Sequence, residues 1–107
     1  NSLPHIEQIF INAPESIDAS KFEQLLYILR KNIEARMATH HDFFICSLSS
    51  KTIIYKALCL PRILKEFYPD LADPLFKTSI CVFHQRFSTN TQPSWHLAQP
   101  FRYLAHN

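Results

Sequence analysis

The feature that most constrains this sequence is the absence of glycine from its 107 residues. Glycine makes up about 7% of an average protein. Its absence excludes the glycine-rich phosphate loop, the GxGxxG dinucleotide fingerprint and the collagen repeat. Tight turns must also form without the one residue that takes a positive φ at no steric cost, so we expect the seven prolines and the Asn, Asp and Ser residues to make them.

Composition and charge indicate one small globular domain. Hydrophobic residues make up 47% of the chain and charged residues 19%, and the formal net charge is only +2. Such a weak and scattered positive charge predicts neither nucleic-acid nor membrane-surface binding. The longest apolar stretch, residues 53–64, is interrupted by Lys56 and Arg62. It is shorter than the roughly 20 residues that a transmembrane helix needs, so no membrane partner is expected.

The three cysteines, Cys46, Cys59 and Cys81, are far apart and odd in number. They form no obvious disulfide framework, which favours a reducing compartment and a cytoplasmic protein. Two chemical alternatives stay open, a zinc site and a Cys–His nucleophile pair. The short paired spacing typical of structural zinc ligands is missing, and each cysteine lies among apolar neighbours, where a thiol behaves as a small hydrophobic group.

Hydrophobic periodicity predicts one long helix over residues 18–38. Ser20 and Glu23 have the spacing of a capping box, in which each side chain satisfies an amide of the first turn. Apolar residues then recur every three or four positions along one face. They are Phe22, Leu25, Leu26, Leu29, Ile33 and Met37.

The rest of the chain predicts an α+β fold. Strands are expected at residues 5–11, 43–48, 52–58, 78–83 and 101–106, with residues 43–59 forming a hairpin and a short helix beginning at Pro61. The order is therefore β-α-β-β-α-β-β. Strands that are not separated by helices favour α+β over a doubly wound sheet.

Residues 84–107 hold the densest group of polar side chains, directly after the expected strand at 78–83. Binding sites are often built where a strand ends. The plainer interpretation is that Ser88, Thr89, Asn90 and Thr91 only form a turn. Likewise Trp95, with the aromatic residues around it, is expected to pack in a core rather than form a binding platform.

Several motifs in this region resemble a known family. HQRFSTNT (84–91), PSW (93–95), LAQPFR (97–102) and LAHN (104–107) follow FYPDLADP (67–74) in order. Together they resemble the glutaminase domain of the glutamate synthase large subunit, a class II, N-terminal-nucleophile glutamine amidotransferase. The likeness extends through essentially the whole chain, which is identified as a central piece of one such domain.

The resemblance implies a fold and a reaction. The fold is the αββα sandwich of the N-terminal-nucleophile hydrolases. An N-terminal cysteine would hydrolyse glutamine to glutamate and ammonia, and the ammonia would be transferred to 2-oxoglutarate. FMN and an iron–sulfur cluster would bind in other domains, so no cofactor is expected in this segment. The partners would be glutamine and the remaining domains, in the cytoplasm or in a plastid if the parent enzyme is ferredoxin-dependent.

The resemblance also implies roles for individual residues. Arg86 would hold the glutamine α-carboxylate, which suits a planar guanidinium. The Asn107 side-chain amide would donate to the oxyanion of the tetrahedral intermediate. Ser88 and Thr89 would line the same pocket.

The nucleophile of the family has no counterpart here. The first residue is Asn1, and all three cysteines are internal. The glycine that follows the oxyanion asparagine in the family is also missing after Asn107. We therefore expect the nucleophile to lie upstream and this segment alone to be inactive. The alternative is a non-catalytic binding or interaction module derived from an amidotransferase.

Overall fold

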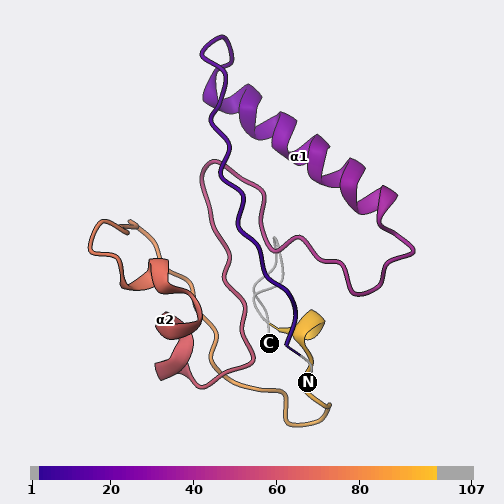
Figure 1. The fold of residues 1–107 in the computed structure, drawn as a ribbon, viewed down its shortest axis with the longest axis vertical. Helices are drawn as coiled ribbons and strands as arrows, with labels where there is room; N and C mark the ends of the chain where they lie inside the picture. The colour runs from indigo at the N-terminus through magenta and orange to yellow at the C-terminus, as the bar shows by residue number, and fades with distance from the viewer. Residues whose placement is uncertain (1–2, 99–107) are drawn as a thin grey trace. The chain divides into compact units, whose positions relative to one another are not determined.

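A computed structural model describes residues 3–98 of the chain. The chain divides into two compact units, Asn1–Ile53 and Ile54–Asn107. The first unit contains the helix α1 (Ala19–Arg36). The second contains η1 (Pro61–Ile63), α2 (Leu64–Phe67), η2 (Pro69–Ala72) and η3 (Trp95–Leu97), which are helical turns of three or four residues. Figure 1 shows α1 as the one long helix among the described residues.

The helix α1 confirms the prediction for residues 18–38, but its cap differs from the expected one. Asp18 is the N-cap, and its Oδ1 accepts hydrogen bonds from the amides of Ser20 and Lys21, both at 2.9 Å. Ser20 therefore lies inside the first turn, and the expected Ser20–Glu23 capping box does not form. An Asp at this position satisfies two amides at once and puts a negative charge at the positive end of the helix. The helix ends at Arg36, and the amide of its C-cap residue, Met37, donates to the Ile33 carbonyl at 2.9 Å.

The packed face of α1 is rotated slightly from the one expected. Leu26 and Arg30 are buried, whereas Leu25 and Leu29 are 39% and 43% exposed. The half-buried residues on the same face as Leu26 are Phe22, Ile33 and Met37. The packed face therefore runs through Leu26, Arg30 and Ile33, which are four and three residues apart and so lie on one side of the helix. Arg30 can be buried on this face because its charge is paired with Glu34, at 3.3 Å.

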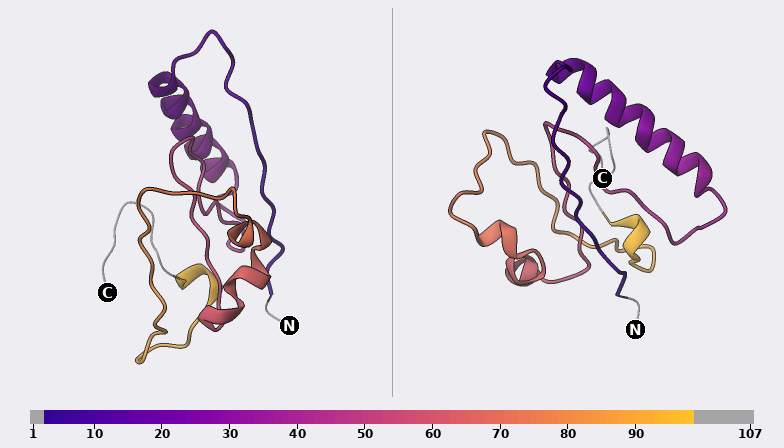
Figure 2. Two further views of the ribbon diagram at one scale, coloured as in Figure 1. Left: turned by 90° about the vertical axis from the view of Figure 1, so that its left-hand side faces the viewer. Right: turned by 45° about the horizontal axis from the view of Figure 1, so that its top comes forward.

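In the second unit, η1 leads directly into α2, and the single residue Tyr68 separates α2 from η2; Figure 2 shows these short coils close together along the chain. Pro61 and Pro69 each stand at the start of a turn, where a missing amide hydrogen costs nothing and the fixed φ suits a helix. The amide of Tyr68 donates to the Leu64 carbonyl at 2.9 Å, and that of Asp73 donates to the Asp70 carbonyl at 3.1 Å. The short helix predicted from Pro61 is therefore confirmed. Prolines start its turns, as expected of a chain without glycine.

Aromatic side chains form the centre of the second unit. The Tyr68 ring lies 4.9 Å from Tyr55 and 5.0 Å from Phe67, in edge-to-face contacts, and Trp95 stacks on Phe67 at 5.7 Å. The Tyr68 hydroxyl donates to the Lys56 carbonyl at 2.6 Å, and the Tyr55 hydroxyl donates to Asp70. Each hydroxyl is thus satisfied where its ring is packed, which is how buried tyrosines are usually accommodated. Trp95 packs with these rings, as the sequence predicted.

The expected strands do not form within residues 3–98. The segments 5–11, 43–48, 52–58 and 78–83 are irregular chain without ladder pairing, with bends at Cys46, Leu58 and Ser79, and the expected hairpin at 43–59 does not form either. The strand expected at 101–106 lies outside the described residues. The order β-α-β-β-α-β-β therefore stays a prediction. The difference has a physical reason, because a helix satisfies its backbone groups within one segment, whereas a strand needs a partner strand for every ladder hydrogen bond.

Candidate functional site

The candidate site residue Arg86 lies on extended chain after the 78–83 segment and is exposed. Its carbonyl oxygen accepts a hydrogen bond from His84 Nε2 at 2.6 Å. Within residues 3–98, the Arg86 guanidinium forms no ion pair with a carboxylate.

Ser88 and Thr89 lie in a turn that Ser88 stabilises. The hydroxyls of Ser88 and Thr91 share a hydrogen bond of 2.7 Å, and the Thr91 amide donates to Ser88 Oγ at 3.2 Å. This is the local arrangement that hydroxyl side chains make in turns. Thr89 is exposed at the bend. The structure thus brings Arg86, Ser88 and Thr89 onto one short exposed segment, whereas Asn107 lies outside the described residues.

The Glu23 carboxylate of α1 accepts three hydrogen bonds from the turn at residues 49–50. Ser49 Oγ donates to Glu23 Oε1 at 2.5 Å, and the amide and hydroxyl of Ser50 donate to Oε2 at 2.8 and 2.7 Å. These hydrogen bonds, that of Ser49 first, hold the pKa of Glu23 below its ordinary value, with a smaller contribution from the charge of Lys51. The arrangement ties the first half of α1 to the 49–52 turn.

Sequence reasoning missed this contact because it assigned Glu23 to a capping box. The only feature of the sequence that could have indicated this contact is the pair of serines in the polar turn at residues 49–50. A shallow groove runs beside the contact and is lined by Ser20, Glu23, Gln24, Tyr27, Ile28 and Lys51. In this groove the Glu23 carboxylate is already engaged by the two serines.

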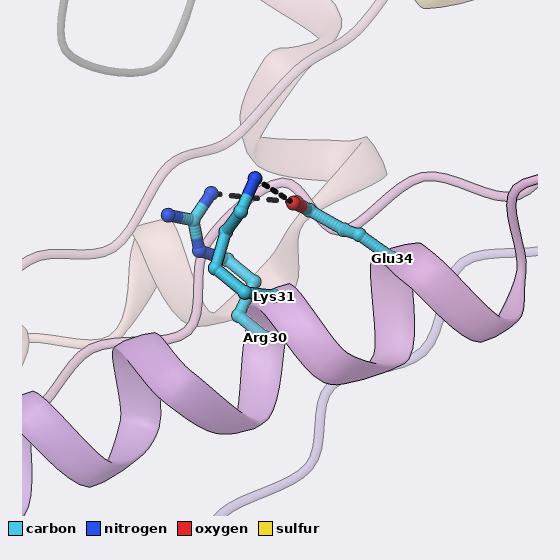
Figure 3. Close-up of polar contacts among 3 residues, drawn as sticks. All are labelled: Arg30, Lys31 and Glu34. Atoms are coloured by element: carbon cyan, nitrogen blue, oxygen red, sulfur yellow. Dashed lines mark hydrogen bonds and ion pairs between the residues drawn. The ribbon is translucent and has the colours of Figure 1, made fainter.

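A second charged cluster lies further along α1, and Figure 3 shows its three side chains converging. Glu34 lies 3.3 Å from the buried Arg30 guanidinium and 3.4 Å from the Lys31 ammonium. Arg30 also lies over the Tyr27 ring, 5.2 Å from its centroid. Paired charges at helical spacing and a cation over an aromatic face stabilise a helix. This cluster therefore has a structural explanation.

The three cysteines are free thiols, with Cys46 and Cys59 half-buried and Cys81 exposed. No group of three or more His, Cys, Asp and Glu residues within residues 3–98 could hold a metal ion. In that same part of the chain, no helix is both long and apolar enough to cross a membrane.

Similarity to known proteins identifies the class to which this sequence belongs. The chain is a member of the class II glutamine amidotransferases, whose family model matches residues 1–107. Among its curated relatives, the large chain of the NADPH glutamate synthase of Azospirillum brasilense is 49% identical over 106 residues, which cover 97% of this chain. The ferredoxin-dependent glutamate synthase 2 of Synechocystis is 47% identical over 107 residues, the full chain. The chloroplastic ferredoxin-dependent glutamate synthase 2 of Arabidopsis thaliana is 42% identical and covers 99% of it.

The matched region covers 7% of the length of each of these relatives. These relatives include enzymes named for NADPH and for ferredoxin. No solved structure is a significant match to the chain.

Proposed function

We propose that this chain is a segment of the glutaminase domain of a glutamate synthase and carries the residues that hold glutamine. The observation that carries the proposal is the 49% identity with the Azospirillum large chain over 97% of this chain, which includes the HQRFSTNT segment. The exposed Arg86 supports it, because its guanidinium has no carboxylate partner within residues 3–98.

In this proposal Arg86 binds the α-carboxylate of glutamine through two parallel N–H···O hydrogen bonds. Lysine is a poor substitute because an ammonium cannot make the same planar contact. Ser88 and Thr89 line the pocket, and the hydrogen bond between Ser88 and Thr91 fixes the turn that carries them. Asn107 donates its side-chain amide to the oxyanion, a contribution worth about 3 kcal/mol in comparable sites.

The proposal also includes the N-terminal-nucleophile sandwich, in which the irregular segments predicted as strands become strands of an α+β domain. FMN and the iron–sulfur cluster belong to other domains of the parent enzyme. These 107 residues contain no cysteine with a free α-amino group, because Cys46, Cys59 and Cys81 are all internal. They are therefore inactive alone. The compartment is the cytoplasm, or a plastid if the parent is a plant-type ferredoxin enzyme.

Calorimetry with glutamine tests the retained binding site. We expect the 107-residue chain to bind glutamine and the Arg86→Ala variant to lose most of that binding, since a charge-assisted bidentate contact is removed. Arg62→Ala is the matched control, because Arg62 is an exposed arginine on η1 in the same unit. No binding by the unmodified chain would overturn the proposed site in this segment. Equal losses in both variants would overturn the role of Arg86.

An ammonia-release assay tests the second part of the proposal. Incubation of the purified chain with glutamine should release no ammonia above background. If the purified chain does release ammonia, and alkylation of its cysteines abolishes that release, an internal thiol acts as the nucleophile. The claim of inactivity would then be wrong.

A further inference from the structure

Side-chain hydrogen bonds hold the short segment that carries Arg86 from both sides. On one side, His84 Nε2 donates to the Arg86 carbonyl at 2.6 Å. On the other side, Ser88 Oγ shares a hydrogen bond of 2.7 Å with Thr91 Oγ1 and accepts from the Thr91 amide at 3.2 Å. Arg86 therefore lies midway between two side chains that fix the local backbone, those of His84 and Ser88.

The contact from His84 acts on the main chain of Arg86 itself. Because the peptide unit is planar, the direction of the Arg86 carbonyl depends on one soft torsion angle, the ψ of Arg86. A hydrogen bond to that oxygen restricts this angle. The rotamers that a side chain can adopt depend in turn on the backbone angles of its own residue. The His84 imidazole thus limits the directions that the Arg86 side chain can take.

Recognition of a carboxylate by arginine depends on such control. The guanidinium must lie in one plane with the carboxylate, so that two parallel N–H···O hydrogen bonds form. Holding a long side chain in one geometry costs rotamer entropy. A binding group therefore works best when neighbouring hydrogen bonds support its productive geometry before the ligand arrives.

We propose that His84 is a positioning residue of the glutamine site, which acts through the main chain of Arg86 and does not itself touch glutamine. The proposal rests on the proposed function and gives a role to the first residue of the HQRFSTNT segment. The contact also defines the form of the ring. A carbonyl oxygen can only accept, so Nε2 carries the hydrogen, and in the neutral ring Nδ1 keeps the lone pair.

Calorimetry with glutamine tests the role through substitutions of His84 that differ in their donor. His84→Phe keeps a ring but has no donor, and we expect the affinity for glutamine to fall about fivefold, the usual effect of one neutral hydrogen bond. His84→Gln places an amide N–H as many bonds from Cα as Nε2, so it should restore most of the affinity. His84→Asn, whose amide is one bond closer to Cα, should not.

His96→Phe is the matched control, because His96 is an exposed histidine on η3 in the same unit. Its affinity for glutamine should equal that of the unmodified chain. Equal losses in His84→Phe and His96→Phe would indicate a general effect of removing an imidazole and overturn the proposal. An unchanged affinity in His84→Phe would also overturn it, as would a His84→Gln variant that binds no better than His84→Phe.

Nuclear magnetic resonance measures the contact itself and needs no glutamine. In its neutral form, His84 should show the tautomer with hydrogen on Nε2, whereas the exposed His96 should show a mixture of both tautomers. The carbonyl carbon resonance of Arg86 should shift in His84→Phe and return in His84→Gln, because it follows the hydrogen bond. A His84 tautomer with hydrogen on Nδ1, or an Arg86 resonance that ignores both substitutions, would refute the contact.

Failure of this role and failure of the glutamine site give different results. The role of His84 alone is wrong if the unmodified chain binds glutamine, Arg86→Ala loses that binding and His84→Phe retains it. No binding by the unmodified chain would overturn the glutamine site, and the role of His84 with it.

Discussion

Glu23 accepts a hydrogen bond from the hydroxyl of Ser49 at 2.5 Å, across 26 residues of sequence. Ser50 adds two more hydrogen bonds to the same carboxylate. The Ser49 hydroxyl in turn accepts from the amides of Lys51 and Thr52, at 3.1 and 3.2 Å. The Glu23 carboxylate therefore organises the turn at residues 49–52. It holds the Ser49 hydroxyl, and that hydroxyl in turn accepts from the amides of the two residues after Ser50.

Replacement of Glu23 by glutamine should destabilise the first unit. The substitution keeps the shape but removes the charge that strengthens three hydrogen bonds, so we expect a loss of about 1 kcal/mol in the free energy of unfolding. Thermal unfolding followed by the helical circular dichroism signal measures it. Glu15→Gln, at an exposed position before α1, is the control and should have little effect. A double-mutant cycle with Ser49→Ala should show coupling, and simple additivity would argue against the contact.

The same contact predicts a pH dependence. The pKa of Glu23 is lowered in the folded chain from 4.5, its ordinary value. Between the lowered pKa and 4.5, the unfolded chain binds more protons, so stability falls as pH falls. The stability difference between the unmodified chain and Glu23→Gln should be full above that ordinary value. It should shrink as the pH falls from that ordinary value through the folded pKa, as denaturant titrations at several pH values can measure. A difference that stays constant down to acid pH would contradict the prediction.

The cap of α1 gives a contrast between two neighbouring residues. Asp18→Ala should cost about 1 kcal/mol of stability, because two first-turn amides lose their acceptor. Ser20→Ala should be neutral or slightly stabilising, since Ser20 occupies a helical position where alanine is preferred. Chemical denaturation gives the free energy of unfolding of both variants. A larger loss for Ser20→Ala than for Asp18→Ala would support the capping box that the sequence suggested.

The aromatic cluster of the second unit can be tested through its tryptophan, since Trp95 is the only one in the chain. Tyr68→Phe removes the hydroxyl that donates to the Lys56 carbonyl and keeps the ring contacts. We expect a loss of about 1 kcal/mol, because a buried acceptor loses its donor. Tryptophan fluorescence during denaturation reports the change. Tyr27→Phe, at a half-exposed ring on α1 in the other unit, should leave this transition unchanged.

Local patterns predicted well what depends on local contacts. The 3,4 periodicity from Phe22 to Met37 predicts α1, and Pro61 predicts the start of the short helical turns. Even there, the capping residue was wrong, because Ser20 and Asp18 both precede an apolar run. Only the backbone shows which of the two lies outside the first turn.

The candidate site was predictable by a different route. Arg86, Ser88, Thr89 and Asn107 come from the motifs that resemble the amidotransferase family, and no spacing rule would have selected them. Their roles stay proposals. What the structure adds is that Arg86 is exposed and that Ser88 is engaged with Thr91, neither of which follows from the motif.

The sequence by itself determined the family and the helices, because motifs are read residue by residue and helical hydrogen bonds close within four residues. It also determined that turns form without glycine. Only the tertiary structure decided that Glu23 binds a turn 26 residues away and that Arg30 is buried on α1. It also decided that residues 78–83 carry no ladder partner within the described chain. These features depend on partners distant in sequence, and the pattern of one segment does not specify its partner.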